Sequence, residues 1–96
     1  MRNKNLTKKV VDLIIQERKA QIKKWGDQSN NHLFEWVSIL AEEMGELAEA
    51  VNETCFKNAQ KKERGGYEAI LKEAIQVAAV ATAIAETIKN KELNNA

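Results

Sequence analysis

Apolar side chains recur along most of this chain at the three- and four-residue spacing of an α-helix. Leu6 and Val10 set this spacing near the N-terminus and predict a first helix over about residues 5–24. The same spacing returns twice and predicts helices over about residues 32–56 and 67–91, the last of which fades into a polar tail from about residue 90.

Two polar breaks separate these predicted helices. The first, residues 25–31, is dense in turn-forming residues and in side chains that cap helices. The second, residues 61–66, is closed by Gly65 and Gly66. The pattern therefore predicts an all-α fold in which residues 1–96 form one domain, a bundle of three main helices.

Composition supports that fold class. The 96 residues include no proline and only four glycines, whereas all-β folds need both for their frequent turns. Three helices of this kind leave apolar stripes without a partner. We therefore expect a homo-oligomer, either a dimer or a dimer of dimers, to complete the bundle.

Several classes of protein do not fit this sequence. The longest uncharged stretch, residues 74–85, is well short of the ~20 apolar residues of a membrane-spanning helix. The N-terminal residues lack the continuous apolar run of a signal peptide. Cys55 is the only cysteine, so an internal disulfide is excluded and the cytoplasm is the expected compartment.

Charge is unevenly distributed along the chain. Residues 1–24 carry a formal charge of +6, residues 25–56 carry −7 and the remainder +2, although the net charge is only +1. The acidic middle segment needs a cation, which is either a basic neighbour or a metal ion. Because the basic segment is offset by this acidic one, nucleic-acid binding is not expected.

The acids of the second predicted helix are not equivalent. At about 100° per residue, Glu43 and Glu46 fall on one flank of the apolar face. Glu42 and Glu49 fall on the opposite, solvated side. The apolar face itself comprises Trp36, Leu40, Met44, Leu47 and Val51.

The third predicted helix has a glutamate within its apolar stripe. Glu73 falls inside this stripe and Gln76 lies beside it. A glutamate in such a position is costly unless it is paired, protonated or bound to a metal ion. The stripe comprises Ile70, Val77, Ala81, Ile84 and Ile88.

Two pairs of oxygen donors therefore lie on facing helices, each pair three residues apart. An all-oxygen set of ligands suits Mg²⁺, and the absence of His or Cys beside it argues against zinc. As the alternative, Glu43 and Glu46 are boundary residues paired with Lys or Arg. The four candidate ligands are Glu43, Glu46, Glu73 and Gln76.

At these residues the sequence resembles the MazG-like all-α nucleoside triphosphate pyrophosphohydrolases. That family carries an EExxE motif on one helix and an ExxD motif on the next, which together bind magnesium. Residues 42–46 read EEMGE, and residues 73–76 read EAIQ in the place of ExxD. Upstream, Glu17, Arg18 and Gln21 match the N-terminal part of bacterial and phage members, and the resemblance covers about residues 12–88.

The resemblance implies hydrolysis of a nucleoside or deoxynucleoside triphosphate to the monophosphate and pyrophosphate. It implies Mg²⁺, with Mn²⁺ as a substitute, and catalytic roles for Glu43, Glu46 and Glu73, of which one carboxylate is a general base. The family's final Asp is Gln76 here, a neutral ligand that contributes less charge. The alternative is a non-catalytic helical interaction protein, or a relative that binds nucleotide without turnover.

Six further residues are candidate contacts of the substrate: Gln21, Lys24, Trp25, Gln28, Lys57 and Arg64. Trp25 either stacks on a nucleobase or anchors a loop. Lys57 and Arg64 belong to a basic run that either clamps phosphates or is simply solvated. Trp36 is expected to pack in the core, and His32 to begin the second helix.

Overall fold

The computed structural model describes residues 5–26, 31–56 and 66–95. They form three helices, α1 (Leu6–Trp25), α2 (Leu33–Cys55) and α3 (Tyr67–Asn95), and no strand occurs within the described ranges. The all-α prediction is confirmed. The first two helices begin and end within one residue of their predicted bounds.

Local chemistry explains where α1 ends and α2 begins. Gly26 ends α1 with a φ of 77°, a left-handed conformation that favours glycine, and its N–H donates to the carbonyl of Ile22 at 2.7 Å. His32 precedes α2, and its Nδ1 accepts from the N–H of Phe34 at 3.2 Å. The Glu35 carboxylate accepts from the N–H of His32 at 3.0 Å, which completes a capping box. The role predicted for His32 at the start of this helix is confirmed.

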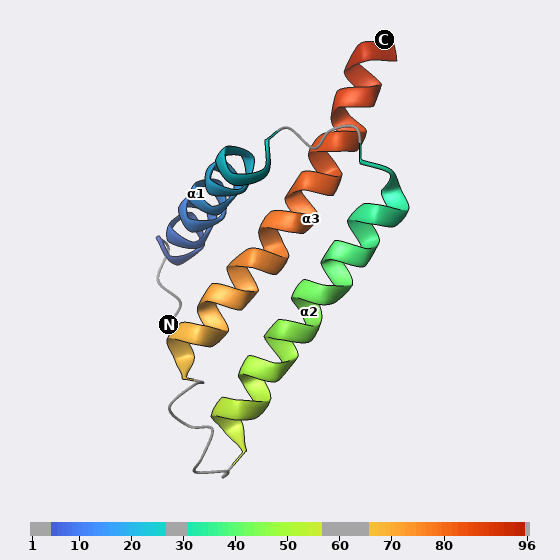
Figure 1. Ribbon diagram of the computed structural model, residues 1–96. Coiled ribbons are helices and arrows are strands. Elements are labelled where there is room, and N and C mark those ends of the chain that lie inside the picture. The colour runs from blue at the N-terminus through green and yellow to red at the C-terminus, as the bar shows by residue number, and fades with distance from the viewer. Residues whose placement is uncertain (1–4, 27–30, 57–65, 96) are drawn as a thin grey trace.

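The C-terminal end of α3 differs from the prediction. The predicted polar tail is helical through Asn95, and Figure 1 shows this end of α3 projecting beyond the other two helices. The segment contains no glycine or proline to stop the helix. Lys89 and Glu92 add an ion pair of 3.2 Å at a favourable spacing along the helix surface.

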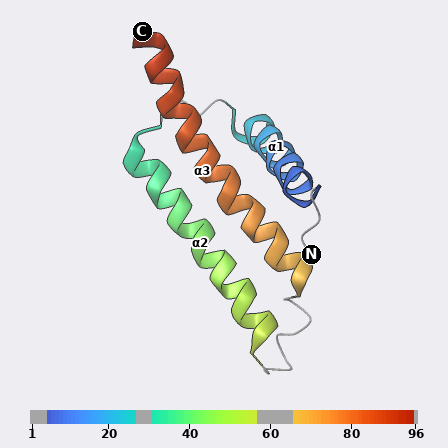
Figure 2. The same cartoon turned by 180° about the vertical axis from the view of Figure 1, so that it is seen from behind.

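The three helices are arranged with α3 in the middle. Both α1 and α2 pack against α3, and α2 runs antiparallel to it (Figures 1 and 2). The Cα atoms extend over 54 × 33 × 22 Å, so the molecule is long and flat. A flat arrangement of so few helices leaves much of each helix surface uncovered.

A small core holds α2 against α3. Trp36 of α2 is only 4% exposed and packs with Val80 and Ala83 of α3. The packing role predicted for Trp36 is therefore confirmed. The small side chains of Ala79 and Ala83 are buried, so the backbone of α3 can approach its neighbours closely.

Some residues of the predicted apolar faces are exposed, so this part of the prediction was wrong. Met44 is 54% exposed, because α2 turns the neighbouring face with Trp36 and Ala50 toward α3. On α3, Ala81 and Ile88 are exposed as well. α3 packs against a helix on each side, so its buried residues lie outside the single predicted stripe.

Large apolar side chains remain on the surface. On α2 the exposed ones include Leu33, Phe34, Val37 and Met44, and none is covered by another described element. Among the described residues, no helix combines the length and the hydropathy that crossing a membrane requires. The exposed apolar surface is therefore distributed along amphipathic helices.

Candidate functional site

Three glutamates from two helices meet where α2 packs against α3. One carboxylate oxygen from each of Glu43, Glu46 and Glu73 lies within 4.8 Å of the others. Glu43 and Glu46 are three residues apart on α2, so they point to the same side, and Glu73 faces them from the antiparallel α3. The prediction that helical spacing would bring these three carboxylates together is confirmed. We call these residues the carboxylate cluster.

Gln76 lies among the same carboxylates. In the amide orientation that satisfies its neighbours, the nitrogen of Gln76 donates to Glu43 Oε2 and to Glu73 Oε2, at 3.1 Å each. The amide thus supplies two of the donors that the carboxylates need. The role of Gln76 as a metal ligand stays a prediction.

The environment of Glu43 disfavours its charged form. Partial burial raises the pKa of Glu43 above its ordinary value of 4.5, and the negative charges around it raise the pKa further. The surrounding acids, in order of their effect, are Glu46, Glu73, Glu17 and Glu42. None of the described Lys or Arg residues offsets these charges at Glu43.

Glu73 is subject to similar effects. Partial burial raises its pKa, and so do the charge of Glu46 and a hydrogen bond between the two side chains. Lys72 acts in the opposite direction but does not reverse the shift. The carboxylate cluster therefore holds more negative charge than its own surroundings stabilise.

The ion pairs of the described residues lie elsewhere. They join Lys8 to Asp12, Arg18 to Glu86 and Lys89 to Glu92. Within residues 5–26, 31–56 and 66–95, no acid of α2 is paired with Lys or Arg, so the alternative given for Glu43 and Glu46 is not observed there. Among the described residues, protonation of a carboxylate or an added cation would relieve the negative charge of the cluster.

The donor set fits a hard divalent cation. All three groups are carboxylates, the ligand type that Mg²⁺ and Mn²⁺ prefer. Oxygens that share one Mg²⁺ at about 2.0–2.1 Å lie within about 4.2 Å of one another. Because the observed spread is within 4.8 Å, small side-chain rotations would bring the three oxygens to that range.

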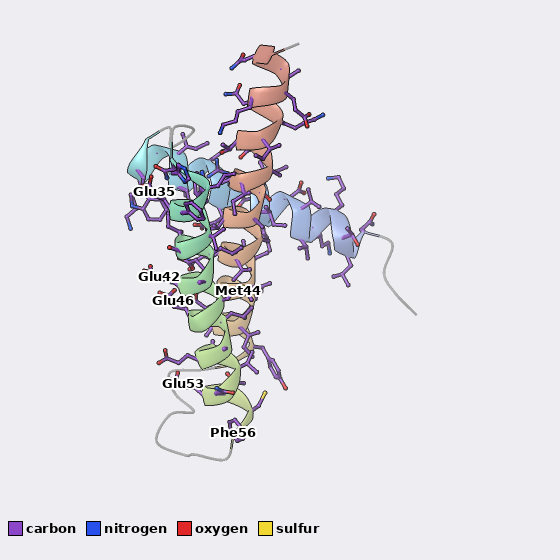
Figure 3. All side chains as sticks on the ribbon, turned by 90° about the vertical axis from the view of Figure 1, so that its right-hand side faces the viewer. Glu35, Glu42, Met44, Glu46, Glu53 and Phe56 are labelled. Atoms are coloured by element: carbon purple, nitrogen blue, oxygen red, sulfur yellow. The ribbon has the colours of Figure 1, made fainter. Side chains whose placement is uncertain are left out.

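The acids also follow one side of α2. In Figure 3, Glu42, Glu46 and Glu53 point away from the same edge of the helix, whereas Met44 lies on the opposite edge. Glu46 is exposed, so the carboxylate cluster is open to solvent on that side. A charged ligand can therefore approach the cluster without displacing a helix.

A pocket of about 240 Å³ adjoins the carboxylate cluster. Gln21 and Trp25 of α1 form one wall, and Trp36, Glu42 and Glu43 of α2 form another. Glu43 belongs to both the pocket and the cluster. We call this cavity the tryptophan pocket, since both tryptophans line it.

Two predicted substrate contacts thus line one cavity. Trp25 is 52% exposed, and Lys24 Nζ lies 5.0 Å from the centroid of its ring, within the range of a cation–π contact. Gln21 is buried at 6% exposure. Gln28, Lys57 and Arg64 lie outside the described residues, so their roles stay predictions.

Trp36 has one polar atom without a partner. Its indole Nε1 is buried, and no described group accepts a hydrogen bond from it. A buried donor of this kind is costly. The tryptophan pocket is thus bordered by a residue whose indole nitrogen has no hydrogen-bond partner among the described residues.

Sequence reasoning assigned no site role to three residues that lie around the carboxylate cluster or the tryptophan pocket. Glu42 was expected on the solvated side, and it is exposed, but it also lines the tryptophan pocket. Glu17 is close enough to raise the pKa of Glu43, and Arg18 holds Gln21. The spacing in the sequence could have indicated that Glu17 and Gln21 face the interior, because both continue the helical spacing of Val10. All three residues are at least partly buried.

Comparison with models of known protein families, with curated proteins and with solved structures finds no match for this chain.

Proposed function

We propose that this protein is a magnesium-dependent nucleoside triphosphate pyrophosphohydrolase of the MazG-like kind. The reaction adds water to the α-phosphorus of a nucleoside or deoxynucleoside triphosphate. The bond between this phosphorus and the α–β bridging oxygen breaks, so the products are a monophosphate and pyrophosphate. Cleaning of the cytoplasmic nucleotide pool is the corresponding cellular role.

The observation that carries this proposal is the unpaired carboxylate cluster beside the tryptophan pocket. Glu43, Glu46 and Glu73 gather oxygens that form no ion pair with a described Lys or Arg, and the pKa values of Glu43 and Glu73 are raised. A protein that used these residues only for packing would gain nothing from such repulsion. A divalent cation would turn the same arrangement into a favourable one.

The residues divide into two groups by what each would do. Glu43, Glu46 and Glu73 would hold the cation, and a carboxylate oxygen not engaged by it would accept the proton of the attacking water. When bound, Mg²⁺ supplies positive charge to the triphosphate oxygens and lowers the pKa of a bound water. Trp25 and Gln21 would hold the base in the tryptophan pocket, which adjoins the cluster through Glu43.

We also propose that the chain works as a homodimer or a dimer of dimers. The exposed side chains of Leu33, Val37 and Met44 lie on one face of α2, and Ile88 is exposed on α3. A second copy would bury this apolar surface and complete the bundle. Light scattering should give a mass at least twice 10.8 kDa. A folded monomer at micromolar concentration would contradict this assembly.

The test of the activity is a screen for pyrophosphate release. The eight common nucleoside and deoxynucleoside triphosphates are incubated with the protein, with Mg²⁺ and with EDTA. We expect pyrophosphate from at least one of them with Mg²⁺ and none with EDTA. Release of orthophosphate instead of pyrophosphate, or turnover that EDTA does not reduce, would exclude the mechanism. Binding of nucleotide with no turnover would favour the non-catalytic alternative.

A further inference from the structure

One histidine organises the start of α2. The Nδ1 atom of His32 accepts a hydrogen bond from the N–H of Phe34 at 3.2 Å, and the N–H of His32 donates to Glu35 Oε1 at 3.0 Å. The carbonyl oxygen of His32 accepts from the N–H of Glu35 at 2.9 Å and from that of Trp36 at 3.1 Å. Four hydrogen bonds at the beginning of the helix therefore depend on the conformation of one residue.

The first turn of α2 has little besides these hydrogen bonds to hold it. The side chains of Leu33, Phe34 and Glu35 are all exposed, so packing contributes little to their order. Trp36 follows directly and is the first buried residue of the helix, where it packs against α3. Loss of the cap would therefore free the chain as far as the residue that begins the core between α2 and α3.

The hydrogen bond from Phe34 to His32 exists only while the imidazole is neutral. An imidazolium carries a proton on both nitrogens, so it donates hydrogen bonds and accepts none. The two rings are stacked with their centroids 4.9 Å apart, and a protonated ring in this place would set its Nδ1–H against the N–H of Phe34. Its charge would also lie at the positive end of the dipole of α2. Histidine takes up this proton between about pH 5 and 8, so acidification favours loss of the cap.

The charged groups around the imidazole do not reverse this effect. Glu35 contacts His32 directly, and its carboxylate already accepts from the backbone N–H of His32. An imidazolium that turned toward Glu35 would leave the N–H of Phe34 without its acceptor, so the cap would be lost in that arrangement as well. Charged side chains in the C-terminal parts of α1 and α3 have partners of their own: Lys24 lies over the ring of Trp25, Glu86 pairs with Arg18, and Lys89 pairs with Glu92.

We propose that His32 is a pH-sensitive cap: when its imidazole takes up a proton, the first turn of α2 opens and Trp36 loosens in the core. The chain contains one histidine, so no other imidazole changes its charge in this range of pH. Because Trp36 lines the tryptophan pocket, the opening extends to that cavity. The device needs neither a bound ligand nor the proposed activity.

The experiment measures unfolding of the full chain by urea at pH 7.5 and at pH 5. His32→Asn keeps a capping side chain that takes up no proton. From pH 7.5 to pH 5 we expect the unfolding constant of the wild-type protein to rise about fivefold relative to that of the variant, the factor that a cap of about 1 kcal/mol represents. Titration of groups that both proteins contain cancels from this comparison. His32→Asp is a second cap that stays unchanged over this interval, and it gives the same comparison should His32→Asn fold poorly.

Amide hydrogen exchange, corrected for the intrinsic effect of pH on the exchange rate, locates the change. At pH 5 the amides of Phe34 and Trp36 should lose protection in the wild-type protein, whereas the amide of Ile14 in α1 should keep it. Exchanging the two residues, Asn31→His with His32→Asn, keeps the composition and moves the imidazole out of the cap, so it should abolish the effect of pH on these amides.

Three results would overturn the inference. The first is an equal dependence of unfolding on pH in the wild-type protein and in His32→Asn. The second is unchanged protection of the Phe34 or the Trp36 amide between pH 7.5 and pH 5. The third is a first turn that is better protected at pH 5, which would mean that the imidazolium stabilises α2 by pairing with Glu35.

Discussion

Two partly buried polar groups lie beside α3, one where α1 packs against it and one where α2 does, and they differ in how their charges are balanced. On the α1 side, Arg18 pairs with Glu86 and donates to Gln21, so opposite charges and hydrogen bonds meet. On the α2 side, Glu43 and Glu73 lie against Glu46 and share the amide of Gln76. Both groups occupy the faces of ordinary amphipathic helices.

The difference between them distinguishes a polar group that stabilises the fold from one that needs a ligand. The Arg18 group is satisfied by the protein itself, and removing a member of it should leave another member unpaired. The carboxylate cluster is strained by like charges, and removing one of them should relieve the others. Substitutions on the two sides of α3 are therefore expected to act in opposite directions on stability.

The largest effect is expected on catalysis. Glu46→Gln and Glu73→Gln should each reduce pyrophosphate release by about 100-fold or more, because each removes an anionic ligand from a small set. Glu49→Gln serves as the matched control, since Glu49 is exposed on the same helix outside the carboxylate cluster. Circular dichroism should show folded protein in all three. Full activity in Glu73→Gln would show that the carboxylate cluster takes no part in the mechanism.

The next effect is on the affinity for magnesium. Gln76→Asp replaces the two donated hydrogen bonds by a fourth carboxylate, which raises the repulsion that Mg²⁺ relieves. We expect the Mg²⁺ concentration at half-maximal activity to fall by about tenfold, the factor that ~1.4 kcal/mol represents. A titration of activity against Mg²⁺ concentration measures this midpoint in the wild-type protein and in the variant. The same midpoint in both proteins would exclude Gln76 from the ligand set.

Thermal stability should separate the two sides of α3 directly. Arg18→Met leaves the buried Gln21 Oε1 without its donor, a loss of about 1 kcal/mol that lowers Tm by about 4–8 °C. Glu73→Gln removes a repelled charge, so in metal-free buffer at neutral pH it should raise Tm. Calorimetry with and without Mg²⁺ tests both. A lower Tm in metal-free Glu73→Gln would contradict the view that the cluster is strained.

The smallest effect is the dependence of stability on pH. The folded-state pKa values of Glu43 and Glu73 lie above the ordinary 4.5, so the folded chain binds more protons than the unfolded chain just above that pH. The free energy of unfolding should therefore fall as pH rises from 4.5 through the raised values. The double variant Glu43→Gln, Glu73→Gln should lose this part of the dependence in metal-free urea titrations.

Much of the fold followed from local sequence features. Gly26 and His32 define the ends of α1 and α2 by their own backbone and capping chemistry, so their positions were predictable within a residue. Glu73 was identified because a single helix period places it among apolar neighbours. These features depend on residues a few positions apart, which a sequence displays directly.

The features that the sequence did not predict depend on how the helices pack against one another. Apolar residues cover two adjacent faces of α2, and nothing local shows that Trp36 rather than Met44 turns toward α3. The contact between Arg18 and Glu86 joins residues 68 positions apart. Gln76 faces Glu43 with its amino group only because of how α2 and α3 meet. Such features become visible only when the helices are assembled.

The central position of α3 has a consequence for how the molecule opens. Helix α1 packs against α3 and α2 packs against α3, so α1 can separate by local unfolding while the α2–α3 pair stays together. The amide protons of α1 should then exchange with solvent faster than those buried between α2 and α3. Such an opening would dismantle the tryptophan pocket, which includes Gln21 and Trp25, and would leave the carboxylate cluster assembled. Under the proposed function, the protein is therefore expected on warming to stop binding a nucleobase before it stops binding a cation.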